Sequence, residues 1–206
     1  MSDDQSKEQN GNDNTDDPYL TGRLLLAMPG MGDPRFERAV IYICSHDDQG
    51  AMGLVVNQIL PQIRFDELVR QMNIPGIEQD TSIKMSGDIP VLKGGPVDTA
   101  RGFVLHGDGF EKPDTIRIDN HFCITGTIDV LESIARGRGP ADMLFMLGYA
   151  GWGAGQLDSE IRQNAWLVGD ADPDLVFHTP YLEKWERTAR KIGFDPAMLS
   201  SQAGRA

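Results

Sequence analysis

The chain has 206 residues, of which 40% are hydrophobic and 24% charged, and its formal net charge at pH 7 is −12. This length and composition predict one globular domain and exclude a fibrous or wholly disordered chain. The acidic balance, with no Lys or Arg run longer than Arg190-Lys191, argues against direct binding to nucleic acid, which requires a basic surface.

The first residues are polar and acidic, whereas a secretory signal is basic and then apolar. No window holds the ~18 consecutive apolar residues that a membrane helix needs. We therefore expect a cytoplasmic, bacterial protein without a membrane span. Residues 1–18 contain six acidic residues and one lysine but no aliphatic side chain after Met1, which predicts a disordered acidic tail. Residues 19–195 are predicted to form the single domain, and residues 196–206 a flexible C-terminal tail.

The first third of the domain has the pattern of an antiparallel sheet. Strands are expected at 24–28, 39–44 and 51–56, with a loop at 29–34 and a hairpin turn at 47–50. Phe65, Leu68, Val69 and Met72 recur at helical spacing, so residues 64–73 are predicted to form an amphipathic helix.

Short strands and helices follow in irregular order. Further strands are expected at 83–85, 103–106, 115–118 and 122–125, and a helix at 128–136. A buried strand at 143–147 is predicted to enter a glycine-rich turn at 148–155 and then a helix at 155–164. Two strands, at 165–168 and 175–177, precede a last helix that begins at Thr179-Pro180, buries Leu182, Trp185, Ala189 and Ile192, and ends at Gly193. The irregular order favours the α+β class.

Neither cysteine has a zinc-ligand pattern around it. Cys44 and Cys123 lie in apolar stretches, so both are interpreted as reduced core thiols. No acyl-transfer signature flanks Cys44, which disfavours a catalytic thiol. We assign no metal site.

The glycine-rich segment 148–155 admits two interpretations. A strand, a glycine turn and a helix N-terminus could bind an anion. The spacing of the glycines fits neither a Rossmann fingerprint nor a Walker A loop, and Asp158 would repel an anion from the first turn of the helix. A structural turn that packs Tyr149 and Trp152 on the core is the favoured alternative.

Two other groups of residues also leave the choice between function and structure open. On the 155–164 helix, Glu160 could act as a general base, or it could belong to a solvated polar face with Gln156. Gly94-Gly95-Pro96 with Arg101 and His106 could approach a ligand and supply charge and proton transfer. The same glycines could equally form a tight bend, with His106 at the end of a strand.

Three blocks of sequence together resemble the YqgE/AlgH family from about residue 20 to 194. They are Gly22–Pro29 with Phe36, Ile41-Tyr42 and Gly50–Asn57; Gly94–Val97 with Arg101–His106; and Leu147–Trp152 with Gly155–Leu157, Glu160-Ile161, Asn164 and Trp166-Leu167. The family motif usually has glutamate where this chain has Asp158.

This resemblance implies a single α+β domain whose split, mostly antiparallel sheet curls into a partial barrel with flanking helices. It also implies a small cytosolic bacterial protein without an assigned reaction, and one branch of the family carries the label of a transcriptional regulator.

We therefore expect a non-catalytic binding or regulatory protein, with an unknown protein or small molecule as its partner and no cofactor. The expected binding residues are Gly94, Gly95, Pro96, Arg101, His106, Gly148, Tyr149, Gly151, Trp152, Gln156, Glu160 and Asn164. The alternative is an enzyme, such as a hydrolase, that uses Glu160 or His106 as general base.

Overall fold

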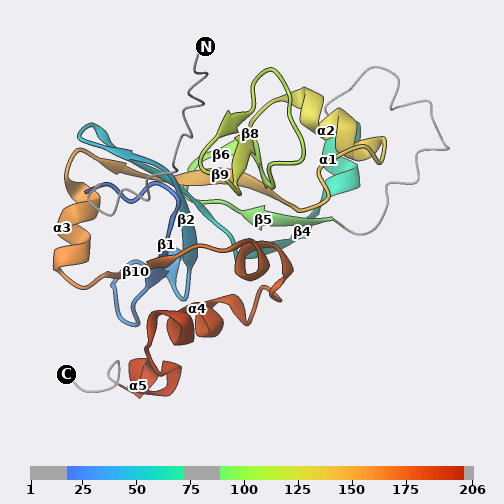
Figure 1. Ribbon diagram of the computed structural model, residues 1–206. Coiled ribbons are helices and arrows are strands. Elements are labelled where there is room, and N and C mark those ends of the chain that lie inside the picture. Colours follow the sequence, from blue (N-terminus) through green and yellow to red (C-terminus); the bar gives the residue numbers. More distant parts are fainter. Residues whose placement is uncertain (1–17, 72–88, 202–206) are drawn as a thin grey trace, which may run out of the picture.

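The computed structural model describes residues 18–71 and 89–201 of the chain, which form a single α+β domain around a curled, half-barrel sheet (Figure 1). The predicted acidic tail before Pro18 and the strand expected at 83–85 lie outside the described residues. None of the helices in the described part of the chain has the length and apolar character needed to cross a membrane.

Ten described strands make the sheet, in the order β10-β1-β2-β3-β9-β6-β8-β7, with β4 and β5 off this path. The strands are β1 (Arg23–Ala27), β2 (Val40–Asp47), β3 (Gly50–Val55), β4 (Ile59–Arg64), β5 (Pro90–Lys93), β6 (Val97–His106), β7 (Ile116–Arg117), β8 (Cys123–Thr125), β9 (Met143–Gly153) and β10 (Trp166–Asp170). The helices are η1 (Pro34–Phe36), α1 (Phe65–Gln71), α2 (Ile128–Ala135), α3 (Gln156–Arg162), η2 (Asp174–His178), α4 (Lys184–Ile192) and α5 (Pro196–Ser201). Figure 1 shows α1 and α2 together at one end of the sheet and α3 at the other.

Strand β9 belongs to both halves of the split sheet. Its first half pairs in parallel with β5 and antiparallel with β6, whereas its second half pairs antiparallel with β3. The predicted glycine-rich turn at 148–155 is therefore wrong for most of its length, because the strand continues to Gly153. Gly153 and Gly151 pair there with Gly50 and Met52 of β3, and a Cβ at Gly50 would lie 2.3 Å from the Trp152 carbonyl oxygen, so the two strands approach closely at this glycine.

The chain between β5 and β6 crosses β9 in close backbone contact. The Gly94 N–H donates to the Leu147 carbonyl at 2.8 Å, and the Gly94 carbonyl accepts from the Val55 N–H at 2.8 Å. A Cβ at Gly94 would lie 2.2 Å from the Gly148 carbonyl oxygen, and a Cβ at Gly95 would lie 2.0 Å from the Tyr149 carbonyl carbon. Only glycine fits at either position, so the two glycine motifs of the sequence meet in one structural contact, which we call the glycine crossing.

The curl of the sheet brings β2 against the segment between β7 and β8. The Tyr42 hydroxyl donates to Asp119 Oδ2 at 2.8 Å, and the Tyr42 and Phe122 rings pack with their centroids 4.6 Å apart. Asp119 also accepts from the backbone N–H groups of His121 and Phe122. These contacts join strands that are separated in the sheet by β3, β9 and β6, which is why the sheet is a half-barrel rather than a flat layer.

Several predicted elements differ from the structure near the C-terminus. Residues 175–177 are not a strand but part of the π-helix η2, in which Asp172 caps the Leu175 N–H at 2.7 Å and consecutive residues Leu175 and Val176 are both buried. The last long helix begins at Lys184, and Leu182, predicted to be buried, is 91% exposed in the turn before it. The segment from residue 196, expected to be a tail, begins with the short helix α5.

The structure confirms other predicted elements, and it contains two strands that were not predicted. Strands β1, β2 and β3 and helices α1, α2 and α3 lie where expected within a few residues. Strands β4 and β5 were not predicted, because each contains a proline, Pro61 and Pro90, and proline argues against a strand. Strand β6 begins at Val97 rather than at 103.

Lys184 occupies a buried position at the start of α4. Its ammonium donates to the Val56 carbonyl at 3.0 Å and to the Val176 carbonyl at 2.5 Å, and it lies 4.6 Å from the centre of the Tyr181 ring. No carboxylate in the described part of the chain forms an ion pair with it. Burial lowers the pKa of Lys184 from its ordinary value of 10.5 to about 7.

We predict that Gly94→Ala lowers the free energy of unfolding by at least about 3 kcal/mol, because the added methyl group meets backbone that cannot move aside. Gly109→Ala is the matched control, since a Cβ there meets no atom within 4 Å. Urea denaturation of the two variants and the wild type measures the difference. Equal stability of the two variants would show that the glycine crossing is not a tight contact.

We predict that Lys184 makes stability rise with pH between about 7 and 10.5. Over this range the unfolded chain binds a proton at Lys184 that the folded chain does not, so raising the pH favours the folded state. The slope contributed is up to about 1.4 kcal/mol for each pH unit. Urea denaturation at pH 7.5 and 9.5 should show this extra slope in the wild type and not in Lys184→Met. Parallel pH profiles for the two proteins would contradict the assignment.

Candidate functional site

The predicted site residues fall in several separate parts of the fold. Gly94, Gly95, Gly148 and Tyr149 form the glycine crossing, and Pro96 follows it before β6. The remaining residues lie on β6 (Arg101, His106), on β9 (Gly151, Trp152), on α3 (Gln156, Glu160) and just after α3 (Asn164). The single binding surface expected from the sequence is thus divided by the fold.

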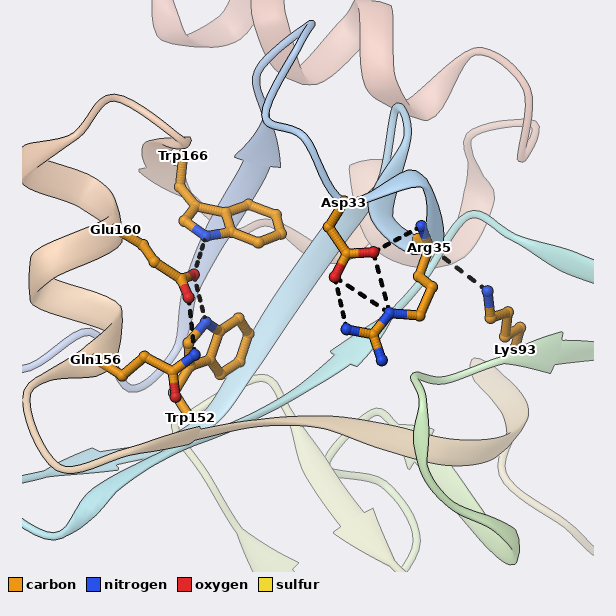
Figure 2. A network of polar contacts seen from close by, with 7 residues as sticks. All are labelled: Asp33, Arg35, Lys93, Trp152, Gln156, Glu160 and Trp166. Atoms are coloured by element: carbon orange, nitrogen blue, oxygen red, sulfur yellow. Dashed lines mark hydrogen bonds and ion pairs between the residues drawn. The ribbon is translucent and has the colours of Figure 1, made fainter.

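Glu160 binds two tryptophans at once (Figure 2). Its Oε2 accepts from Trp152 Nε1 at 2.9 Å and from Trp166 Nε1 at 2.8 Å, and its Oε1 accepts from Gln156 Nε2 at 2.8 Å. Gln156 in turn accepts from the Gly153 N–H at 3.0 Å. We call this set the Glu160 cluster, and it ties α3 to β9 and β10.

The geometry of the Glu160 cluster fits a structural role. A general base needs a lone pair directed at a substrate proton, whereas both carboxylate oxygens of Glu160 face N–H donors of the protein. Asn164 ends the same helix in the left-handed region, at φ 58°, and its N–H donates to the Ile161 carbonyl at 2.9 Å. Trp166 completes the cluster, and the sequence offered no signal that would pair it with Glu160.

A neighbouring ion pair lies between this cluster and β5 (Figure 2). Arg35 donates to both carboxylate oxygens of Asp33, at 2.6–3.1 Å, and Lys93 donates to the Arg35 carbonyl at 3.4 Å. A cavity of about 440 Å³ lies beside this loop, over Trp185. Two of its charged side chains are paired, since Asp33 holds Arg35 and Arg38 donates to Glu186 at 3.0 Å.

His106 is completely buried at the end of β6. Its Nδ1 lies 2.8 Å from the Gly107 carbonyl, which can only accept, so Nδ1 carries the proton and Nε2 accepts from the Thr125 hydroxyl at 2.9 Å. The Thr125 hydroxyl lies 2.8 Å from that of Thr115, which accepts from the Lys112 N–H. Burial lowers the pKa of His106 and keeps the imidazole neutral. Both ring nitrogens are therefore occupied by the protein.

A cavity of about 900 Å³ lies inside the curl of the sheet. Cys44 of β2, Met52 of β3, Ile124 of β8 and Tyr149 of β9 all line it, together with Arg101 and Phe103 of β6. The lining also includes the hydroxyl-bearing residues Ser45, Thr115 and Thr127, the acidic Asp114, and Pro113, Ile116 and Gly126. A large, mostly apolar hollow with a few polar groups is the usual form of a small-molecule site. We call it the Arg101 cavity.

A bulge in β6 places Arg101 at this cavity. Strand β6 pairs with Tyr149 at Val97 and next with Leu147 at Gly102, so residues 98–101 face a much shorter stretch of β9. Asp98 has φ 46° within the bulge, opposite Gly148 at φ 71°. A Cβ at Gly148 would lie 2.8 Å from the Val97 carbonyl oxygen, so the bulge wraps tightly around this glycine.

The Arg101 guanidinium lies over an aromatic wall. It is 5.0 Å from the centre of the Phe103 ring, which packs edge to face on Tyr149 with centroids 6.0 Å apart. Within residues 18–71 and 89–201 it forms no ion pair. Arg101 and Tyr149 were predicted from the sequence, whereas Phe103 and Thr127 were missed, because nothing in the sequence shows that distant strands curl together.

The two cysteines are free, Cys123 buried and Cys44 half-buried. Burial raises the pKa of the Cys44 thiol, so it stays protonated although it lines the Arg101 cavity. In the described part of the chain, no three His, Cys, Asp or Glu side chains gather in a way that could hold a metal ion.

Comparisons with known proteins give one consistent result. A family model described as AlgH-like matches residues 24–197. A UPF0301 protein of Bradyrhizobium diazoefficiens is 52% identical over 192 residues, covering 91% of this chain and 89% of the relative, and one of Jannaschia sp. is 50% identical over 189 residues, covering 91% and 95%.

Two solved structures are also similar. The solution structure of the AlgH protein from Pseudomonas aeruginosa has a TM-score of 0.71 at 38% identity, covering 98% of this chain and all of that one. The crystal structure of a Corynebacterium diphtheriae protein has a TM-score of 0.65 at 20% identity, covering 97% and 95%, and shows a shared fold.

We predict that Glu160→Ala destabilises the protein by roughly 1–3 kcal/mol for each indole N–H that it leaves without a partner. Glu183→Ala, which removes an exposed pairing with Arg187 on α4, is the control and should cost no more than about 0.5 kcal/mol. Urea unfolding followed by tryptophan fluorescence measures both. A Glu160→Ala protein as stable as the wild type would contradict the structural role of the Glu160 cluster.

Proposed function

This chain belongs to the AlgH-like family, and we propose that it serves as a non-catalytic binding protein that holds a small organic anion in the Arg101 cavity. The observation that carries the proposal is the guanidinium of Arg101, which forms no ion pair within the described residues and lies over the Phe103 ring at the wall of a large, mostly apolar hollow. The proposal keeps the cytoplasmic location and the domain limits predicted from the sequence.

The chemistry of the cavity favours an anion with an apolar body. A guanidinium presents a planar fork of donors that matches a carboxylate or a phosphate, and stacking on an aromatic ring holds that plane in place. Phe103, Ile124 and Tyr149 give the rest of the cavity an apolar wall. A ligand that combined one negative group with an apolar part would satisfy both features.

The state of the candidate bases supports binding rather than catalysis. Both carboxylate oxygens of Glu160 and both ring nitrogens of His106 are engaged by protein groups, and the Cys44 thiol is protonated. The hydrolase alternative named Glu160 or His106 as its base, and neither residue lines the Arg101 cavity. A regulatory role would then act through the bound ligand. The net charge of −12 argues against direct binding of the protein to DNA.

The test compares the thermal stability of three proteins in a panel of aliphatic and aromatic carboxylates and phosphate monoesters. At least one anion should raise the Tm of the wild type by several degrees, since a ligand that binds only the folded state stabilises it. Arg101→Gln should bind that anion at least about tenfold more weakly, because it loses a charge-assisted pair.

Arg117→Gln is the matched control for this experiment. Arg117 is an exposed arginine on β7 that does not line the cavity. Its replacement therefore changes the net charge by the same amount as Arg101→Gln but leaves the proposed site intact. An anion that stabilised Arg101→Gln as strongly as the wild type, or a panel that stabilised no variant at all, would count against the proposal.

A further inference from the structure

A second, smaller cavity of about 140 Å³ lies beneath helix α2. Leu68 of α1, Leu131 of α2 and Phe145 and Leu147 of β9 line it, and none of its lining residues is charged. Gly126 and Thr127 line both this cavity and the Arg101 cavity. The two hollows therefore adjoin at the segment that leads from β8 into α2.

We propose that the ligand of the Arg101 cavity is an amphipathic anion with an unbranched aliphatic chain. Its anionic head pairs with Arg101, and the end of its chain lies in the smaller cavity beneath α2. This inference rests on the proposed function and adds the chemical class of the ligand. The proposal rests on two cavities that adjoin. The large one has Arg101 in its lining, and the lining of the small one offers only apolar and hydroxyl groups.

The size and lining of the smaller cavity favour a chain over a ring. A volume of about 140 Å³ accommodates several methylene groups, and its apolar walls offer no partner for polar substituents. Burying methylene groups against such walls is favourable in proportion to the area removed from water. An unbranched chain is also slimmer than a bulky ring system, which suits two hollows that share only Gly126 and Thr127 in their linings.

The junction itself is built from a glycine and a threonine. A Cβ at Gly126 would lie 3.6 Å from the Phe103 ring and 3.8 Å from the Gly102 carbonyl oxygen, so a larger side chain there would extend toward the wall shared with the Arg101 cavity. The Thr127 Oγ1 is buried and makes no hydrogen bond within the described part of the chain. Buried hydroxyl groups normally have a partner, and an anionic head near the junction would supply an acceptor.

Two large apolar side chains are exposed where such a ligand would cover them. Ile116, at the Arg101 cavity, is 65% exposed, and Ile128, at the smaller cavity, is 52% exposed. Their exposure fits a surface that a chain-like ligand partly covers.

The test titrates the full-length protein with butyrate, hexanoate and octanoate. Affinity should rise by roughly tenfold for each added pair of methylene groups until the smaller cavity is filled. With octanoate labelled with ¹³C at its terminal methyl group, nuclear Overhauser effects should connect that methyl group to Leu131 and Phe145. A parallel titration with octyl phosphate shows whether a phosphate or a carboxylate head group binds more tightly. Tight binding of either compound supports the inference.

The variant Gly126→Val is designed to block the junction, and Gly109→Val is its control because a Cβ at Gly109 meets no atom within 4 Å. Gly126→Val should reduce octanoate affinity to no more than that of butyrate, whereas Gly109→Val should bind both as the wild type does. If Gly126→Val does not fold, Ala100→Leu fills the smaller cavity from an exposed position on β6 and should give the same result.

The outcomes separate this inference from the proposed function. Equal affinity along the chain-length series, with binding still dependent on Arg101, would overturn the aliphatic chain and leave the anion site in place. Octanoate binding that is unaffected by both Gly126→Val and Arg101→Gln would overturn both.

Discussion

The close contact of Gly94 and Gly95 with Gly148 and Tyr149 determines how the sheet divides and where its cavity lies. At this crossing the chain leaves β5, passes over β9 and enters β6, while the Gly94 carbonyl also accepts from Val55 of β3. Three segments of the sheet are thus joined by backbone groups at a single point. Because the backbones lie too close for any side chain, the requirement for glycine is steric and does not depend on a ligand.

The position of Arg101 follows from the same contact. Strand β6 can pair with β9 on both sides of the crossing only if residues 98–101 bulge around Gly148, and the bulge ends at Arg101. Phe103, two residues further along β6, provides the ring over which the guanidinium lies. The glycine motifs and the candidate anion site are therefore parts of one arrangement, in which the glycines shape the backbone and the arginine supplies the chemistry.

Much of the fold could be predicted from local patterns, and the candidate site only in part. Short apolar runs separated by turn residues located β1, β2 and β3, and helical spacing located α1 and α2. The π-helix at Asp174–His178 was mistaken for a strand because Leu175, Val176 and Phe177 are apolar in succession, a pattern that both structures can produce. Arg101 and Tyr149 were named from their motifs, but Phe103 and Thr127 join them only through the curl of the sheet, which depends on contacts such as Tyr42 with Asp119.

The proposed function requires that the Arg101 cavity holds a ligand in the cell. The most direct measurement is a native mass spectrum of the protein purified gently from its own host, compared with that of Arg101→Gln purified in the same way. If the cavity binds a small organic anion, the wild type carries a discrete additional mass, and this mass is absent from Arg101→Gln. A bare chain in both spectra, or the same additional mass on both proteins, would contradict the proposed function.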